Sequence, residues 1–279
     1  MSYHREITPK KSLGQHFLKD LTVAERIADT ISEYSGLPIL EVGAGTGVLT
    51  QFLPQAQTTV VELDRDSIAY LKAHFPDLNG RIIEADFLQL DLDKLFAVPF
   101  CVIGNYPYNI SSQIFFKVLD YRDKIPCCAG MLQKEVAERL AAKAGKKAYG
   151  IITVLLNVWY DIEYLFTVEP EVFDPPPKVR SAVIRMTRNA RTALDCNEAL
   201  LKTIVKTAFN QRRKTMRNGL QSLLGKGNEL FALPIFDKRP EQLSVEEFIE
   251  LTKLITSEKT AKNLVCTEFL PNFAPFLTI

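Results

Sequence analysis

The segment Glu41-Val42-Gly43-Ala44-Gly45-Thr46-Gly47 is the strongest indication of fold class in this chain. It follows directly on the apolar run Pro38–Val42, which predicts a buried strand, and it opens a helix predicted over Thr46–Leu53. Glycines at this point let the backbone turn tightly and approach a ligand with no Cβ in the way. Such a turn is typical of open α/β sheets, which bind ligands at the carboxyl ends of their strands.

The same alternation of apolar runs and helix-length segments continues along the chain. Near-continuous hydrophobic strands separated by helices predict a parallel sheet covered on both faces. The further strands are predicted at Thr58–Glu62, Arg81–Ala85, Phe100–Gly104 and Cys127–Leu132, and the further helices at Asp66–His74, Ser111–Tyr121 and Gln133–Ala144. Two later runs, Ile162–Val168 and Ala182–Met186, are expected to close the sheet as an antiparallel pair. We therefore expect an α/β, Rossmann-like, mostly parallel seven-stranded sheet.

The pattern changes after about Thr187. From Glu198 onward only helical periodicity is found, with one apolar face formed by Leu200, Leu201, Ile204, Val205, Ala208 and Phe209. A second helix is predicted from Val245, with Ser244 as N-cap and Glu247 completing a capping box. We expect an α/β domain over residues 1–188, a small all-α domain over 189–265 and a tail over 266–279.

Composition excludes several classes of protein. The start of the chain has no apolar core of a secretory signal, and no stretch approaches the roughly 20 apolar residues that a membrane span needs. The five cysteines show no CxxC spacing, so we expect reduced thiols and no metal site. These features indicate a cytoplasmic protein that does not bind membranes.

Positive charge is segregated although the net charge is only +1. Between Ala199 and Asn228 there are seven basic residues and no acidic one: Lys202, Lys206, Arg212, Arg213, Lys214, Arg217 and Lys226. The N-terminal segment adds Arg5, Lys10, Lys11 and Lys19 against Glu6. A polyanion binder needs such clusters, and a solvated helix face is the alternative that charge alone leaves open.

Two carboxylates follow the next predicted strands. Glu62 ends the second strand, 19 residues beyond Gly43, where its carboxylate can accept both hydroxyls of a ribose. Asp86 ends the third strand and can take an adenine amine. NAD enzymes use a similar loop, but the spacing here is G-x-G-x-G rather than G-x-G-x-x-G, and Asp86 is an additional acceptor. Both features favour S-adenosylmethionine as the cofactor.

The segment Gly104-Asn105-Tyr106-Pro107-Tyr108-Asn109-Ile110-Ser111 ends the fourth predicted strand. An aryl amine such as adenine N6 is a poor nucleophile, because its lone pair is delocalised into the ring. The Asn105 oxygen and the Tyr106 carbonyl can each accept one N–H, which localises the lone pair. Pro107 stiffens the loop, and Tyr108 offers a stacking face worth about 1–3 kcal/mol per base. The pattern predicts methyl transfer by positioning and electrostatics, without a general base.

From about Lys10 to about Leu254 the chain resembles the small-subunit rRNA adenine N6-dimethyltransferases. The landmarks are Lys10–Leu18, Glu41–Gly47, Val61–Asp66, Asn105–Ser111, Gln133–Arg139, Val172–Val179 and Ala208–Lys214. The resemblance implies a methyltransferase domain whose basic segment 1–19 closes over the cofactor, followed by a helical RNA-binding domain. Two residues depart from the usual pattern, His16 where Asn is common and Tyr106 where Leu is usual.

The resemblance also assigns roles to particular residues. Gly43 would lie under the methionine part of the cofactor, Glu62 on the ribose, Asp86 on the adenine amine, and Asn105 between cofactor and target. The complete cofactor-binding set is His16, Leu18, Gly43, Gly45, Glu62, Asp86 and Asn105. Phe173 would form a second stacking wall opposite Tyr108, so the catalytic set is Asn105, Tyr106, Pro107, Tyr108 and Phe173. The RNA-binding set is Lys10, Lys11, Arg212, Arg213, Lys214 and Arg217.

By this resemblance the substrate is a pair of adjacent adenines in the 3′-terminal hairpin loop of 16S rRNA. Each adenine would receive two methyl groups late in assembly of the small subunit, leaving S-adenosyl-L-homocysteine as the product. The partner would be 16S rRNA within the 30S ribosomal subunit precursor. The target base must leave its stack to reach the pocket, and we expect a monomer.

Three other functions stay open at this point. An erythromycin-resistance-type methyltransferase would act on 23S rRNA, although the Asn210–Thr215 and Phe173–Val179 segments favour the small-subunit branch. A non-catalytic assembly or transcription factor could keep the fold, but the presence of Asn105 and Glu62 speaks against it. An NAD-dependent dehydrogenase would explain the glycine loop alone.

Overall fold

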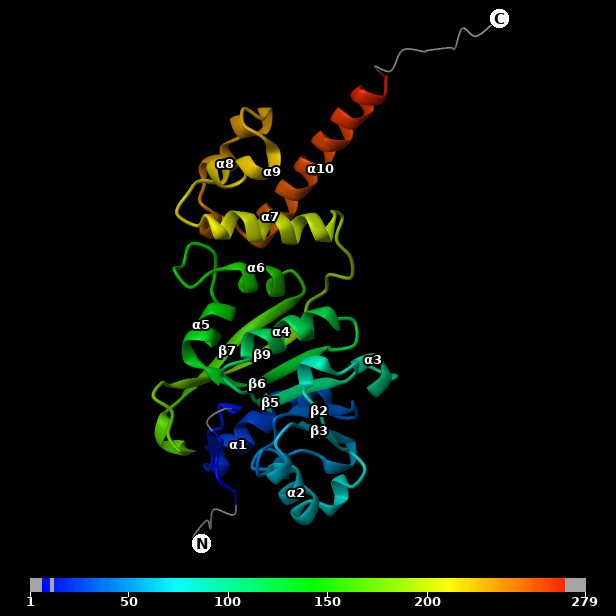
Figure 1. The fold of residues 1–279 in the computed structure, drawn as a ribbon, viewed down its shortest axis with the longest axis vertical. Coiled ribbons are helices and arrows are strands. Elements are labelled where there is room, and N and C mark those ends of the chain that lie inside the picture. The colour runs from blue at the N-terminus through cyan, green and yellow to red at the C-terminus, as the bar shows by residue number, and fades with distance from the viewer. Residues whose placement is uncertain (1–6, 11–12, 269–279) are drawn as a thin grey trace, which may run out of the picture. The chain divides into compact units, whose positions relative to one another are not determined.

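The computed structural model describes residues 7–10 and 13–268, with side chains described as far as residue 258. The chain forms two compact units (Figure 1). The first comprises Met1–Ala142 and Leu156–Arg191, and the second comprises Lys143–Leu155 and Thr192–Ile279. The short segment Lys143–Leu155 therefore belongs with residues much later in the chain, which no boundary drawn along the sequence anticipates.

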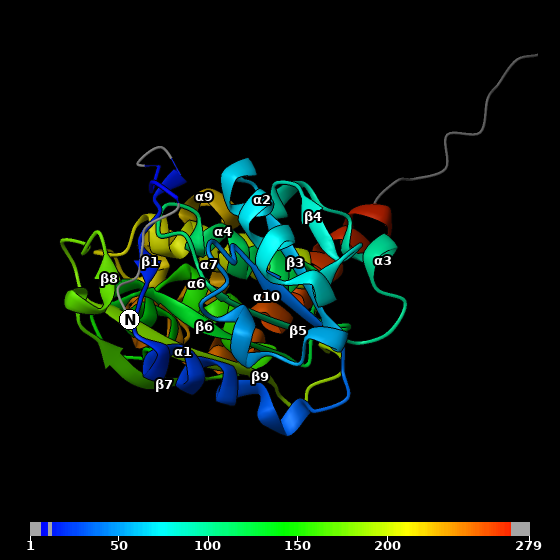
Figure 2. The same cartoon turned by 90° about the horizontal axis from the view of Figure 1, so that it is seen from below.

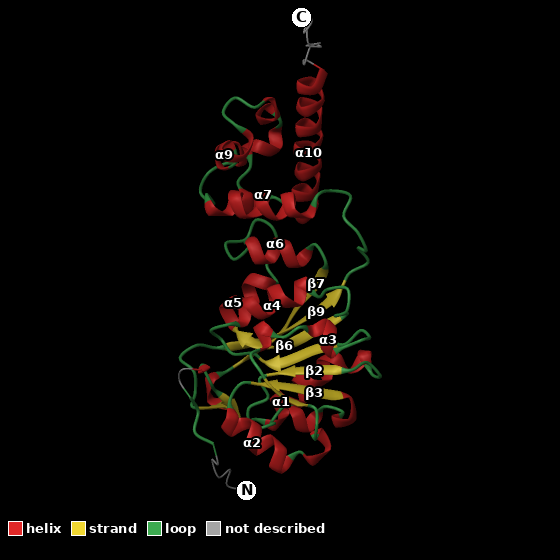
Figure 3. Ribbon diagram, turned by 45° about the vertical axis from the view of Figure 1, so that its right-hand side comes forward, coloured by secondary structure: helices red, strands yellow, loops and turns green. Residues whose placement is uncertain are grey.

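The first unit is built on a seven-stranded sheet with the order β4-β3-β2-β5-β6-β9-β7 (Figure 3). Five strands are parallel, namely β2 (Ile39–Val42), β3 (Thr58–Glu62), β4 (Ile82–Glu84), β5 (Cys101–Asn105) and β6 (Cys127–Gln133). The last two, β7 (Tyr160–Val168) and β9 (Ser181–Arg188), are antiparallel to each other, and β9 is antiparallel to β6. The predicted Rossmann-like, mostly parallel sheet is confirmed.

The strand order reverses at β2, which pairs with β3 on one side and β5 on the other. In open α/β sheets, ligands bind at the carboxyl ends of the strands where such a reversal occurs. The register aligns Glu41 with Ile103, so the loop that begins at Gly43 and the loop that begins at Tyr106 leave the sheet side by side. The topology therefore brings the two motifs of the sequence to one edge.

Helices cover the sheet. They are α1 (Leu21–Ala28), α2 (Arg65–His74), α3 (Leu92–Leu95), α4 (Ser111–Asp120) and α5 (Lys134–Leu140). Ala24 and Ile27 of α1 pack in one hydrophobic cluster with Ile103 and Ala129 of the sheet. A separate two-stranded sheet pairs β1 (Phe17–Leu18) with β8 (Phe173–Asp174). Short 3-10 turns lie at Asp29–Tyr34, Thr50–Phe52, Gln55–Gln57, Pro76–Leu78, Phe87–Gln89 and Pro170–Val172.

Two helix predictions are wrong, one entirely and one in extent. Residues predicted as the helix Thr46–Leu53 form turns and the 3-10 segment Thr50–Phe52, because Gly47 has φ +76°, which a right-handed helix does not accept. The helix predicted over Gln133–Ala144 ends at Leu140.

The second unit contains helices and 3-10 turns in its described part. The helices are α6 (Ile151–Asn157), of which all but the last two residues belong to this unit, α7 (Glu198–Asn210), α8 (Met216–Gly219), α9 (Gln221–Leu224) and α10 (Val245–Glu268). The 3-10 turns are Glu229–Ala232, Pro234–Asp237 and Pro240–Gln242. The predicted capping box of α10 is confirmed: Glu247 N donates to Ser244 Oγ at 3.1 Å, and Ser244 N donates to Glu247 Oε2 at 2.9 Å. Phe209 stacks on Phe248 inside this unit.

Three further findings concern membrane spans, cysteines and metal sites. None of the helices described here is both long and apolar enough to cross a membrane. Cys101, Cys127 and Cys128 are buried free thiols, Cys196 is a free thiol, and the side chain of Cys266 lies outside the described residues. Among the described side chains, no group of three or more His, Cys, Asp or Glu residues is placed to hold a metal ion. The tail from residue 269 also lies outside the described part.

Candidate functional site

A single cleft in the first unit gathers the sequence motifs. Its walls come from the N-terminal segment, the glycine loop after β2, the ends of β3 and β4, and the loop after β5. The lining residues are Leu13–Leu18, Glu41–Thr46, Val48, Leu49, Val61–Leu63, Ala85–Leu88 and Asn105–Ile110. Figure 2 shows β1 of the N-terminal segment beside β8 in this unit.

The glycine loop requires glycine for two reasons. Gly43 and Gly45 have φ values of +73° and +56°, which side-chain-bearing residues rarely adopt. In addition, a Cβ on Gly45 would lie 2.9 Å from Cε1 of Phe17. The missing side chain thus lets the ring of Phe17 pack on the loop, and it leaves the backbone open to the cleft.

Glu62 is buried, and its carboxylate is oriented by backbone donors. Oε1 accepts the N–H groups of Leu63 at 2.8 Å and Asp64 at 2.9 Å, and Oε2 accepts that of Gly45 at 2.9 Å. A carboxylate offers about two acceptor positions per oxygen. Oε2 therefore has one acceptor position left for a ligand hydroxyl, and Oε1 has none. The sequence predicts that Glu62 accepts both hydroxyls of a ribose, whereas this geometry leaves a position for one.

Asp86 and Glu41 are two further carboxyl groups that line the cleft. Asp86 Oδ1 accepts the N–H of Leu88 at 2.9 Å, which fixes the carboxylate as the cap of the turn after β4. Lys117 of α4 holds the same turn, because its ammonium donates to the carbonyls of Leu88, at 3.1 Å, and Leu90. Glu41 was not among the predicted site residues. Burial raises its pKa to about 8, although a hydrogen bond from Thr50 opposes the shift.

Asn105, the last residue of β5, is held by the N-terminal segment. Its Nδ2 donates to the backbone carbonyl of His16 at 3.3 Å. Among the described residues, no donor pairs with Oδ1. The amide is therefore tied through its nitrogen, and its oxygen is left as an acceptor within the cleft that the sequence predicts as the reaction site.

The phenol of Tyr106 points into the protein. Tyr106 is 1% exposed, its hydroxyl donates to the carbonyl of Ala129 at 2.8 Å, and its ring meets Phe115 edge to face. Space for the ring exists because Gly104 and Gly130 lack side chains: their Cβ atoms would lie 3.0 Å and 2.7 Å from ring carbons of Tyr106. The tyrosine ring, which stands where leucine is usual, therefore packs in the core. Only the backbone of Tyr106 is available for chemistry in the cleft.

The ring that faces Tyr108 belongs to His16. The two rings stack with centroids 5.6 Å apart, and the Tyr108 hydroxyl shares a hydrogen bond with Ser181. Phe173, predicted as the second wall, is 1% exposed and packs in the hydrophobic core with Leu18. The wall predicted at Phe173 is not formed in this structure, because pairing of β1 with β8 turns its ring into the core.

The predicted RNA-binding residues fall into two groups. Lys10, Arg212 and Arg217 are engaged: Lys10 with Asp64 and Asp66, Arg212 with the carbonyl of Lys147 at 2.6 Å, and Arg217 with Asp237 at 2.6 Å. Arg213 and Lys214 are exposed, and no ion pair joins them to a described residue. Lys11 lies outside the described residues.

A second basic segment lies beside Arg212, and sequence reasoning missed it. The exposed loop Lys143-Ala144-Gly145-Lys146-Lys147 belongs to the same unit. It is held there by the Arg212 contacts and by a 2.6 Å hydrogen bond from Gly145 N to the Glu241 carbonyl. The sequence does show a basic cluster here, with three lysines in five residues. It does not show that this cluster lies next to Arg212, because that depends on the fold.

The geometry of Glu62 predicts a strong effect on cofactor affinity. Replacing Glu62 with Gln exchanges one acceptor oxygen for an NH₂ group, which would face backbone N–H groups that are also donors. We therefore expect binding of S-adenosylhomocysteine to weaken by about 10–100-fold. Glu84→Gln is the matched control, because Glu84 also ends a strand but is exposed and pairs with Arg65. Calorimetry measures both, and wild-type affinity in Glu62→Gln would show that this carboxylate does not hold the cofactor.

Known proteins match most of this chain. Residues 7–257 match the family model described as ribosomal RNA adenine dimethylase. The chain is 69% identical to the ribosomal RNA small subunit methyltransferase A of Parabacteroides distasonis over 89% of this chain and 94% of that protein. It is 60% identical to the protein of the same description from Porphyromonas gingivalis, over 89% of this chain and 98% of that one.

Solved structures agree on the fold. A dimethyladenosine transferase from Plasmodium falciparum superimposes with a TM-score of 0.75 at 23% identity, covering 88% of this chain and 98% of the other. The 23S rRNA methyltransferase ErmE gives a TM-score of 0.63 at 26% identity, covering 85% and 99%. Because the family model spans nearly the whole described chain, the protein belongs to the ribosomal RNA adenine dimethylase family.

Proposed function

We propose that this protein transfers methyl groups from S-adenosylmethionine to N6 of two adjacent adenines in the 3′-terminal hairpin loop of 16S rRNA. The product is N6,N6-dimethyladenosine, made late in assembly of the small ribosomal subunit. The observation that carries the proposal is the amide of Asn105, tied through Nδ2 to the His16 carbonyl with its oxygen left as an acceptor in the cleft. Relatives at 60–69% identity that are described as small-subunit methyltransferases support the choice of substrate.

The residues of the cleft fit S-adenosylmethionine. Gly43 and Gly45 allow the backbone turn that lines the cleft, Glu62 offers an acceptor to a ribose hydroxyl, and Asp86 offers one to an adenine amine. When bound, S-adenosylmethionine supplies an electrophilic methyl group on a positively charged sulfur. We propose His16 and Leu18 as further contacts from the N-terminal segment, since both line the cleft.

The protein's own groups prepare the target amine. Asn105 Oδ1 accepts one N–H of adenine N6 and the Tyr106 carbonyl accepts the other, so that the nitrogen lone pair points along the remaining direction. Tyr108 stacks on the base, and its hydroxyl bond to Ser181 fixes the ring. Pro107 keeps the loop rigid. Attack on the sulfonium methyl leaves the nitrogen as a methylated ammonium cation, which is acidic enough to release its proton to solvent without a basic side chain. The rate therefore comes from positioning and electrostatics.

Binding of the RNA is proposed to rest on the exposed cations of the second unit. Arg213 and Lys214 are available for phosphates, and the neighbouring lysine loop 143–147 adds charge of the same sign. Replacing Arg213 and Lys214 together with Ala should weaken RNA binding and reduce the slope of log K against log salt by about 1.5, while cofactor binding stays unchanged.

Fluorescence titration at several salt concentrations measures this slope. Lys253→Ala is the matched control, since Lys253 belongs to the same unit but its ammonium is already paired with Asp195 and Glu250. An unchanged slope in the double variant would mean that Arg213 and Lys214 do not contact phosphates.

Methylation of ribosomal particles tests the function directly. Purified protein, labelled S-adenosylmethionine and 30S or 50S particles from cells lacking the gene are combined, and the nucleosides are analysed by mass spectrometry. We expect N6,N6-dimethyladenosine in 30S RNA and none in 50S RNA. Label in 50S RNA would favour an erythromycin-resistance-type activity, to which the likeness to ErmE points. Absence of label in both would favour a non-catalytic assembly factor.

Membership of a family of methyltransferases removes the dehydrogenase alternative, which rested on the glycine loop alone. The cytoplasmic location and the monomeric state stay predictions from the sequence.

A further inference from the structure

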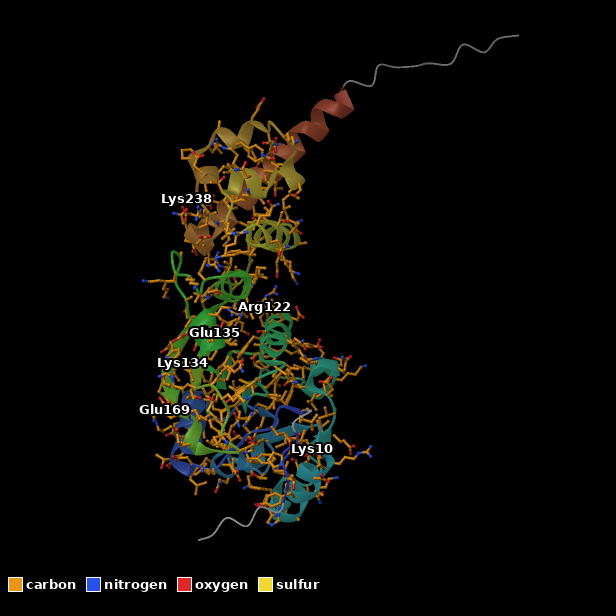
Figure 4. All side chains as sticks on the ribbon, turned by 60° about the vertical axis from the view of Figure 1, so that its left-hand side comes forward. Lys10, Arg122, Lys134, Glu135, Glu169 and Lys238 are labelled. Carbon is orange, nitrogen blue, oxygen red and sulfur yellow. The ribbon has the colours of Figure 1, made fainter. Side chains whose placement is uncertain are left out.

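The N-terminal segment is attached to the cleft at separate points. We call residues Lys10 and Leu13–Leu18 the strap. One end of the strap meets the turn after β3, its middle meets the end of β5 and the glycine loop, and its other end pairs with β8. Figure 4 labels Lys10 at the first of these attachments.

The first attachment converges on Asp64, whose side chain is fully buried. Lys10 donates to Oδ1 of Asp64 and lies 2.8 Å from Asp66, while Gln15 Nε2 donates to Oδ2 of Asp64 at 3.0 Å. Gln15 Oε1 also accepts the backbone N–H of Lys10 at 2.8 Å, so the two residues that bind Asp64 are hydrogen-bonded to each other as well. We call Lys10, Gln15 and Asp64 the clasp.

The clasp holds an ionised carboxylate. Burial alone would raise the pKa of Asp64, but hydrogen bonds from Lys10, Gln15 and Ser67 outweigh it, and the pKa lies below its usual value. A buried charge that loses a partner is left without compensation, so these contacts resist opening more than surface ion pairs do. The strap is thus fixed at this end.

The middle of the strap reaches the reaction centre. The His16 carbonyl, one residue beyond Gln15, accepts from Asn105 Nδ2 at 3.3 Å, and the ring of Phe17 covers Gly45. Toward β8, His16 Nδ1 lies 2.8 Å from the Pro175 carbonyl, and Lys19 N donates to the Val172 carbonyl at 2.9 Å. The position of the His16 carbonyl is therefore set from both sides.

The turn that carries Asp64 also orients Glu62, the carboxylate proposed to bind the cofactor's ribose. Asp64 N donates to Glu62 Oε1 at 2.9 Å, so one turn bonds Glu62 through its backbone and the strap through its side chain. The chain of contacts runs from Glu62 through Asp64, Gln15 and His16 to Asn105.

We propose that Lys10, Gln15 and Asp64 are positioning residues for methyl transfer: the clasp holds the His16 carbonyl on the Asn105 amide, so that Asn105 Oδ1 stays aimed at the target amine. The proposal rests on the proposed function. It gives Lys10 a role in holding the strap rather than in binding RNA phosphates, because its ammonium is paired with Asp64 and Asp66.

Single-turnover methylation of 30S particles at saturating cofactor tests the clasp. Gln15→Ala and Lys10→Met should each lower the rate at least tenfold, with RNA affinity and its salt slope unchanged, and Lys10→Arg should restore most of the rate. Arg65→Met is the matched control, since Arg65 begins α2 next to Asp64 but pairs with exposed Glu84 and does not touch the strap. It should methylate at the wild-type rate.

A double variant separates positioning from a merely structural role. If the clasp acts through Asn105, adding Gln15→Ala to Asn105→Ala should lower the rate less than twofold further. The same tenfold loss in both backgrounds would overturn the proposal, as would a wild-type rate in Gln15→Ala and Lys10→Met. Failure of the wild-type protein to methylate 30S RNA would instead contradict the proposed function.

Discussion

Replacing Asn105 with alanine is expected to lower the single-turnover rate of adenine methylation by about 10²–10³-fold, the usual effect of removing one preorganised hydrogen-bonding group from a reaction centre. Asn105 is bound to the His16 carbonyl through Nδ2, so its oxygen enters the cleft already oriented. Without that oxygen, one amine hydrogen has no acceptor, and the nitrogen lone pair stays in the ring.

Two controls accompany this variant. Binding of S-adenosylhomocysteine to Asn105→Ala, measured by calorimetry, should weaken far less than the methylation rate falls, because Glu62 and the glycine loop are untouched. Asn79→Ala changes an asparagine that ends the turn after α2, outside the cleft, and should methylate normally. A methylation rate within threefold of wild type for Asn105→Ala would remove Asn105 from the mechanism.

Gly130→Ala should destabilise the fold by about 3 kcal/mol and lower the melting temperature by roughly 6–12 °C. Gly130 lies opposite Gly104 in the parallel pairing of β5 and β6, with φ +150°. A Cβ there would lie 2.2 Å from the Gly104 carbonyl oxygen and 2.7 Å from Cε2 of Tyr106. The oxygen belongs to the backbone of a central strand, so moving it would cost free energy by distorting the sheet.

Thermal unfolding followed by circular dichroism measures this effect. Gly150→Ala is the matched control, because its Cβ would meet nothing closer than 3.9 Å and its φ is not in the left-handed region. A melting temperature for Gly130→Ala within 2 °C of wild type would mean that the strands separate easily at this point. The buried position of the Tyr106 ring would then not require glycine at residues 104 and 130.

The parts of the fold that follow local patterns could be predicted from the sequence. Apolar runs located every strand of the large sheet, and Ser244 with Glu247 located the start of α10, because each signal lies within a few residues. The failure at Thr46–Leu53 arose from Gly47, since periodicity does not show that a glycine has φ +76°.

The site could be predicted in part. Strand-end positions brought Gly43, Glu62 and Asn105 to one cleft, because carboxyl ends of parallel strands meet at one edge. The direction of the Tyr106 ring could not be read from its neighbours, since it depends on Gly130 on another strand. The bond between His16 and Asn105 joins residues 89 positions apart and exists only in the folded chain.

The role of Asn105 is tested most directly by a crystal structure of the protein with S-adenosylhomocysteine and an RNA hairpin that carries the target adenines. We expect adenine N6 about 2.7–3.2 Å from Asn105 Oδ1, with the base stacked on Tyr108. An Asn105 oxygen turned toward the protein, or an N6 atom more than about 4 Å from it, would exclude Asn105 as the acceptor of the target amine.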